Sequence, residues 1–195
     1  MLLNQLALET LKKRLEPIAL VKKPETGKMP RAAVAVILNA LEEEFALLLV
    51  RRTIRQRDPW SGQIAFPGGH MTSQDSTLLD TAIRETREEV GISLLNHELL
   101  GRINDAHSRR RELVVTPFVA SLRWRRAIVL QREEVAEATW VPINNLQKSP
   151  SIRRCIKTSE GELEADGIPY GDQIIWGLTL RIINDLLSRL DHENE

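Results

Sequence analysis

Acidic side chains crowd one short stretch of the chain, residues 84–92, which reads RETREEVGI. Glu85 precedes Glu88 by three residues and Glu89 by four, so a helix would bring the three carboxylates onto one surface patch. Like charges at these spacings destabilise a helix by about 0.2–0.5 kcal/mol per pair, and the C-terminal end of a helix dipole also disfavours anions. A cation would remove both penalties. Carboxylates without a neighbouring His or Cys favour a hard ion, which predicts Mg²⁺ or Mn²⁺ bound by Glu85, Glu88 and Glu89.

A simpler interpretation of the same stretch is a solvated, charged helix end. In that case Arg84 would pair with Asp80 and Glu88, as is common on exposed helix faces. The residues that precede the acids favour chemistry instead. Gly68 and Gly69 allow the backbone to bend sharply and to approach a ligand closely, so we predict that they contribute to a substrate site.

Three arginines precede these glycines. Arg52, Arg55 and Arg57 carry guanidinium groups, whose fork of N–H donors matches the oxygens of a phosphate. We therefore predict that they bind substrate phosphates. Each of them could also be an ordinary solvated surface charge, and the sequence leaves that alternative open.

The acids need a helix to position them, and the pattern predicts one over residues 77–90, which contain no Gly or Pro. Its buried stripe is predicted to comprise Leu79, Ala82, Ile83, Thr86 and Val90. Gly91 is the expected helix stop, because a left-handed conformation costs glycine least. The three glutamates project away from the apolar stripe, which predicts that they lie on the surface.

The remaining elements indicate an α/β domain with a mixed sheet. Residues 32–38 and 45–52 are apolar runs of strand length that predict a hairpin, and further strands are expected in residues 112–122 and 138–143. Residues 167–173 are predicted to be a loop. A final helix is expected over residues 174–190, with one stripe formed by Ile175, Leu178, Ile182 and Leu186.

The predicted organisation is a single domain with a short N-terminal addition. Residues 1–30 are expected to form an amphipathic helix, which Pro17 ends, and a polar linker. Residues 31–190 form the domain, and residues 191–195 a frayed tail.

Composition excludes several classes of protein. The chain has 195 residues, of which 42% are hydrophobic and 28% charged, as expected for a soluble domain with a core. Lys+Arg and Asp+Glu are equal at 27 each, so no overall field would attract nucleic acid. No apolar run reaches the roughly 18 residues of a membrane span, and the first residues lack the features of a signal peptide. A single cysteine suits a reducing compartment, which predicts a cytoplasmic protein. A homodimer remains open.

The acidic stretch resembles the Nudix box, G-x5-E-x7-R-E-U-x-E-E-x-G-U, in which U is a bulky aliphatic residue. The fixed positions are matched by Gly69, Arg84, Glu85, Glu88, Glu89, Gly91 and Ile92. Thr86 occupies the first U position, and the spacing from Gly69 to Arg84 is one residue longer than in the general pattern. The first glutamate is also missing, with Asp75 or Ser76 in its place. This extension is similar to the coenzyme A pyrophosphatase branch of the superfamily.

A second motif resembles the same branch. Its pattern is L-L-T-x-R-(S/A)-x3-R-x3-G-x3-F-P-G-G, and residues 48–69 read LLVRRTIRQRDPWSGQIAFPGG. Val50 replaces the threonine, Thr53 replaces the small residue, and the loop from Arg57 to Gly62 is one residue longer. With the distal segments EEVAEATWVPI and IIWGLTLRII, the resemblance covers residues 32–187.

The resemblance implies a Nudix-type α/β/α sandwich with a mixed β-sheet and a catalytic loop-helix-loop. It implies metal-dependent hydrolysis of the phosphoanhydride of coenzyme A or an acyl-CoA, giving 3′,5′-ADP and 4′-phosphopantetheine or its acyl form. Glu85, Glu88 and Glu89 would hold the metal, and Arg84 would orient their carboxylates. Glu134, or Glu133 beside it, is a candidate general base, although both could lie in a solvated loop.

Two other functions remain open at this point. One keeps the Nudix chemistry but changes the small-molecule nucleotide substrate to ADP-ribose, a dinucleotide or a nucleoside triphosphate. The other is a catalytically silent Nudix fold that binds a nucleotide or a protein. The crowded glutamates argue against silence, because a binding module would not need that repulsion.

Overall fold

The structure is a computed structural model that describes residues 2–18, 30–39, 44–56, 58, 60–108, 112–124, 126–158 and 161–190. The helices are α1 (Leu2–Arg14), α2 (Leu78–Val90), α3 (Ile143–Lys148) and α4 (Gly177–Leu190), with a 3₁₀ turn η1 at Asn96–Glu98. The strands are β1 (Arg31–Asn39), β2 (Ala46–Arg52), β3 (Ile64–Ala65), β4 (Gly68–His70), β5 (Leu99–Arg102), β6 (Ala106–Ser108), β7 (Leu113–Leu122), β8 (Val135–Pro142), β9 (Ile152–Thr158), β10 (Gly161–Tyr170) and β11 (Gln173–Trp176).

The main sheet is mixed, as the sequence predicts. Strands β1 and β7 run parallel at its centre, and their register pairs Arg31 with Val114 and Asn39 with Leu122. The other pairings are antiparallel, including the expected β1–β2 hairpin. The order is β3-β2-β1-β7-β5, while β4, β6 and β8 pair with β1, β7 and β2. The sheet therefore brings β2, β4 and β8 close together around β1.

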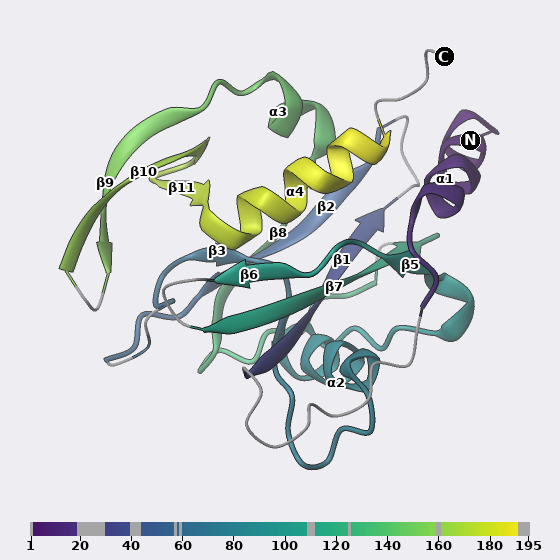
Figure 1. The fold of residues 1–195 in the computed structure, drawn as a ribbon, viewed down its shortest axis with the longest axis horizontal. Coiled ribbons are helices and arrows are strands. Elements are labelled where there is room, and N and C mark those ends of the chain that lie inside the picture. The colour runs from purple at the N-terminus through teal and green to yellow at the C-terminus, as the bar shows by residue number, and fades with distance from the viewer. Residues whose placement is uncertain are drawn as a thin grey trace.

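Two apolar cores lie on opposite faces of this sheet, because successive side chains of a strand point to opposite faces. On β1, one face presents Ala32, Val36 and Leu38 to a core that includes residues of α1 and α4. The other face presents Ala33, Ala35 and Ile37 to cores that include residues of α2. Figure 1 shows α2 on one side of the sheet and α4 on the other, which confirms the α/β/α arrangement.

Helix α2 is capped at both ends, within a residue of the predicted bounds. The Thr77 side chain accepts a hydrogen bond from the Asp80 N–H, and the Asp80 carboxylate accepts one from the Thr77 N–H. This reciprocal pair satisfies two backbone donors that the first turn leaves unpaired. Gly91 ends the helix in the left-handed region at φ 73°. The stripe is only partly as predicted, since Leu79 and Ile83 are half-buried.

The C-terminal third contains a second sheet that the sequence analysis did not predict. Its order is β11-β10-β9, and only the turn at Gly171–Asp172 separates β10 from β11, where a longer loop was expected. The final helix was predicted three residues too early, because residues 173–176 are strand β11. Ile175 is therefore a strand residue paired with Ile168. The buried stripe of α4 comprises Ile182, Ile183, Leu186 and Leu187.

The predicted N-terminal helix is present as α1, which contacts α4. Leu11 of α1 and the following Leu15 are buried in the core that also contains residues of α4. The linker at residues 19–29 and the tail at residues 191–195 lie outside the described residues, as does Arg57. Among the helices that the structure describes, none is long and apolar enough to cross a membrane.

Candidate active site

Three carboxylates converge beside the glycine loop. Glu85 and Glu89 come from α2, whereas Glu134 immediately precedes β8. One carboxylate oxygen from each lies within 4.8 Å of the others. Strand β8 pairs with β2, and the Thr53 N–H donates to the Glu134 carbonyl at 2.9 Å, so the sheet positions this third carboxylate. The structure therefore brings together two of the predicted metal ligands and the candidate base.

Glu89 is buried, with only 1% of its surface exposed. Its Oε2 accepts a hydrogen bond from the Gly68 N–H at 2.9 Å, and its Oε1 lies 3.7 Å from the Arg52 guanidinium. Burial raises the pKa of Glu89 to about 7, although the Gly68 hydrogen bond and the charge of Arg52 act in the opposite direction. The prediction of a surface position for Glu89 is wrong, because the glycine loop covers this part of the helix.

The backbone requires glycine at position 68, and the Glu85 carboxylate lies close against position 69. Gly68 has φ 152°, and a Cβ there would lie 2.3 Å from the Ala33 carbonyl oxygen. A Cβ on Gly69 would lie 2.6 Å from the carboxylate carbon of Glu85. Strand β4, which contains both glycines, pairs with β1 and so lies directly against α2. The small residues therefore allow the carboxylates of α2 to reach the backbone.

The surroundings of Glu85 also disfavour its ionised carboxylate. Its carboxylate is mostly buried and accepts a hydrogen bond from Arg84 Nη1 at 2.8 Å. Burial raises the pKa of Glu85, and the neighbouring charges of Glu88 and Glu134 raise it further, against the lowering effect of Arg84. Two buried carboxylates with raised pKa values next to a third are the arrangement that a divalent cation would relieve.

Arg84 holds the acidic network together. Its Nε and Nη2 donate to the two carboxylate oxygens of Asp75, both at 2.9 Å. Its Nη1 donates to Glu85 at 2.8 Å and to Glu88 at 3.0 Å. This bidentate pairing holds the pKa of Asp75 well below its usual range. The alternative pairing of Arg84 with Asp80 is not what the structure shows, because Asp80 caps the helix.

Glu88 lies apart from the three converging carboxylates. Its side chain is 48% exposed and accepts from Arg84, one turn along the helix. The 100° rotation per residue explains the difference, since it moves Glu88 toward solvent while Glu89 points under the glycine loop. The sequence could not separate these neighbours, because it does not reveal which side the loop covers.

The predicted phosphate-binding arginines differ in their surroundings. Arg52, at the end of β2, donates to Asp58 through Nε at 3.3 Å and through Nη2 at 3.0 Å. Arg55 is more exposed, and its guanidinium lies 3.9 Å from Glu134. Asp58 was not predicted as a site residue. The only signal for it was its place in the unusual sequence DPWSG, in the lengthened loop.

Arg52 and Asp58 line a cleft of about 700 Å³, called the main cleft here. Its charged and glycine lining includes Arg52, Gly68, Gly69, Glu85, Glu89 and Glu134. Its apolar lining includes Val115, Leu163, Trp176, Leu178 and Ile182. The main cleft therefore combines the converging carboxylates with apolar side chains from β7, α4 and the second sheet.

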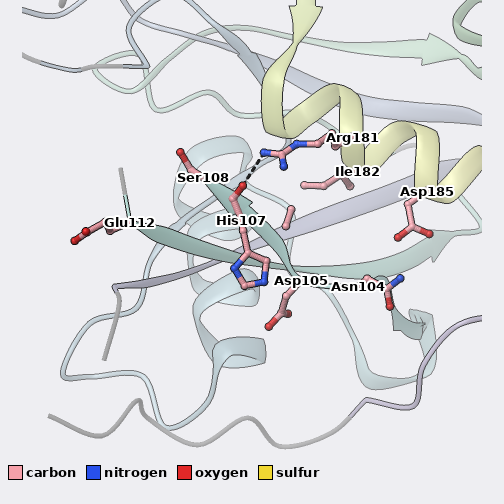
Figure 2. A pocket seen from close by; sticks show the side chains of 9 residues that line it. Asn104, Asp105, His107, Ser108, Glu112, Arg181, Ile182 and Asp185 are labelled. Carbon is pink, nitrogen blue, oxygen red and sulfur yellow. Dashed lines mark hydrogen bonds between the residues drawn. The ribbon is translucent and has the colours of Figure 1, made fainter. Parts of the chain in front are cut away.

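A side pocket of about 600 Å³ adjoins the main cleft, and the two share His107, Ser108, Arg181 and Ile182. Figure 2 shows Arg181 reaching from α4 toward β6, where its Nη2 donates to the His107 carbonyl at 2.8 Å. The other residues that line the side pocket include the acidic residues Asp105 and Asp185. The converging glutamates lie in the main cleft and not in this pocket.

Comparison with known proteins identifies the family of this chain. The sequence profile of the NUDIX domain matches residues 29–158. The chain is 32% identical over 161 residues to an uncharacterized Nudix hydrolase NudL of Photorhabdus laumondii, covering 82% of this chain and 85% of that protein. The chain therefore belongs to the Nudix family. It is a Nudix hydrolase, an enzyme that acts on pyrophosphate bonds of nucleotide derivatives.

Solved structures share the fold at low sequence identity. A MutT/nudix family protein from Enterococcus faecalis aligns with a TM-score of 0.58 and 18% identity, covering 88% of this chain and 67% of that one. The NUDIX domain of Shewanella oneidensis NrtR, solved with ADP ribose, aligns with a TM-score of 0.59 and 18% identity, covering 85% and 90%. At this identity the likeness establishes the fold alone.

Proposed function

We propose that the enzyme hydrolyses the phosphoanhydride of coenzyme A or an acyl-CoA, using Mg²⁺ or Mn²⁺, to give 3′,5′-ADP and (acyl-)4′-phosphopantetheine. The observation that carries the metal-dependent chemistry is the convergence of Glu85, Glu89 and Glu134 within 4.8 Å in a cleft. The choice of coenzyme A is supported by residues 48–69, which resemble the motif of that branch and contribute several walls of the same cleft.

The residues present fit a hard divalent cation. All three groups are carboxylates, and burial raises the pKa of the two on α2, so a positive charge placed between them would stabilise their ionised forms. A divalent ion bound there would neutralise phosphate charge and activate water. We propose Glu85 and Glu89 as ligands. Glu88 remains a proposed ligand that would have to turn away from Arg84 to contribute.

The chain's own groups have separate proposed roles. Glu134 is the only one of the three converging carboxylates that lies outside the acidic helix, and its partial exposure leaves it able to take a proton from an attacking water. Arg84 orients Glu85 and Glu88 while Asp75 holds its other side. Such a fixed guanidinium keeps the carboxylates in place without itself contacting substrate.

Phosphate binding is assigned to the arginines at the end of β2 and in the loop that follows it. Arg55 is exposed beside Glu134, and Arg52 lies in the wall of the main cleft. We propose that both contact the diphosphate, together with Arg57. Gly68 and Gly69 complete the wall next to the carboxylates. We further propose that the enzyme acts on small nucleotides in the cytoplasm and does not bind nucleic acid, in line with its balanced charge.

The test compares kcat/KM for coenzyme A, dephospho-coenzyme A, ADP-ribose and a diadenosine polyphosphate under one metal condition. Coenzyme A should be preferred. Dephospho-coenzyme A should be clearly poorer, because loss of the 3′-phosphate would leave a basic partner unsatisfied. Glu89→Gln, purified identically, controls for contaminating activity. A tenfold or greater preference for ADP-ribose or a dinucleotide would reject coenzyme A and keep the Nudix chemistry. No turnover of any substrate would favour a silent binding module.

A further inference from the structure

Strands β9 and β10 form a hairpin whose two faces differ in chemistry. Figure 1 shows this hairpin extending beyond the start of α4, away from the main sheet. Its register pairs Ile156 with Leu163, and these two residues therefore share one face. The opposite face carries charge pairs, with Arg153 bound to Asp166 at 3.0 Å. The charged face is compatible with exposure to solvent. The apolar side chains of Ile156 and Leu163 on the other face need a different explanation.

That face is turned toward the main cleft. Leu163 and Thr158 of the hairpin line the cleft, and so does Trp176 of β11. The register places Trp176 opposite Gly167, on the same face as Leu163. Leu163 and Trp176 are half-buried, and in the described part of the chain they lie outside the buried apolar clusters. Their apolar surface is therefore presented to the space of the cleft.

The same cleft is lined by Glu85, Glu89 and Glu134. A substrate whose diphosphate lies at the carboxylates would extend its remaining part along the cleft. The apolar wall favours substrate binding only if an apolar group of the substrate covers it, because burial of apolar surface contributes favourably to the free energy of binding. The phosphate groups of such a substrate offer no apolar surface that could cover Leu163.

We propose that Leu163, together with Trp176, determines specificity by binding an apolar arm carried on the second phosphate of a nucleoside diphosphate substrate. This inference rests on the proposed hydrolysis of a phosphoanhydride in the main cleft, and it narrows the substrate class to esters with an apolar end. In the reaction, water adds across the P–O–P bond, giving a nucleoside monophosphate, the phosphate of the arm and a proton. The arm itself is unchanged, so it acts through binding alone.

The test uses adenosine diphosphate esters whose second phosphate carries a methyl, butyl or octyl group. Wild-type kcat/KM should rise with chain length, by up to about fourfold per buried methylene and by about tenfold or more from methyl to octyl. Dissociation constants from titration calorimetry provide a second series that does not depend on turnover. Coenzyme A is assayed in parallel as an independent check on the proposed function.

Leu163→Asn should flatten this dependence and leave the methyl ester within about twofold of wild type. Glu164→Asn is the matched control, because the neighbouring residue lies on the opposite, exposed face of the same strand. The control should keep the wild-type dependence, and both variants should keep the wild-type Tm.

A wild-type series with no chain-length dependence would overturn the inference, as would equal effects of the two variants or an absence of binding by every ester. A clear dependence without hydrolysis of coenzyme A would reject the proposed substrate while supporting the apolar wall. Hydrolysis of coenzyme A without chain-length dependence would support the proposed substrate and reject the apolar wall.

Discussion

Replacing Glu89 by glutamine separates the cost of a buried carboxylate from its proposed role in holding a metal. Burial raises the pKa of Glu89 from its ordinary 4.5 to about 7. The folded protein therefore holds this proton to a higher pH than the unfolded chain does. The free energy of unfolding must fall as pH rises from about 4.5 to about 7, and stay lowered above that range. At 1.36 kcal/mol per pKa unit, the destabilisation reaches about 3 kcal/mol.

Glu89→Gln removes this titration but keeps an oxygen that can accept from the Gly68 N–H. In EDTA, the free energy of unfolding of the variant minus that of wild type should increase by about 3 kcal/mol between pH 4.5 and pH 8. Denaturant unfolding at several pH values measures this difference. In EDTA at pH 8 the variant should be the more stable protein. Mg²⁺ or Mn²⁺ should make wild type the more stable one, because the ion raises the Tm of wild type but not of the variant. The variant should also lose turnover.

Glu88→Gln is the control for the EDTA series, because Glu88 is the neighbouring residue and its side chain is about half exposed. It should change stability by less than about 0.5 kcal/mol at every pH. Parallel pH curves for Glu89→Gln and wild type would refute the assigned cost of burial. Full activity of wild type in excess EDTA would refute the metal.

Three further outcomes test the rest of the site. Gly69→Ala should fold with little change in Tm yet weaken metal binding and turnover, because its Cβ meets only the end of the Glu85 side chain and would displace that carboxylate, whereas Gly68→Ala meets backbone and should lower the Tm clearly. Asp75→Asn should destabilise the protein by about 2 kcal/mol at pH 7; the difference should begin to shrink below about pH 4, where the unfolded Asp75 protonates first, and disappear only at the much lower pH where the folded carboxylate also protonates. Arg55→Ala should raise KM with kcat nearly constant, and kcat/KM within about twofold of wild type would exclude a phosphate contact.

Local pattern was sufficient for the acidic helix. Caps and periodicity are properties of adjacent residues, so α2 and its stop at Gly91 could be predicted from the sequence. The apolar runs likewise predicted the β1–β2 hairpin and the strands β7 and β8. The sequence predicted that Gly68 and Gly69 contribute to a substrate site, which stays a prediction; the structure shows that this glycine segment packs against the carboxylates of α2.

Burial and convergence could be read only from the tertiary structure. Helical spacing treats Glu88 and Glu89 as equivalent neighbours, but the packing of β4 against α2 buries one and leaves the other half exposed. Glu134 joins the site only because β8 pairs with β2, a contact between distant segments that no local pattern encodes. The second sheet was missed for a related reason. Strands β9 and β10 are polar on one face and turn toward a cleft on the other, so their stability comes from cross-strand pairing and not from a continuous apolar run.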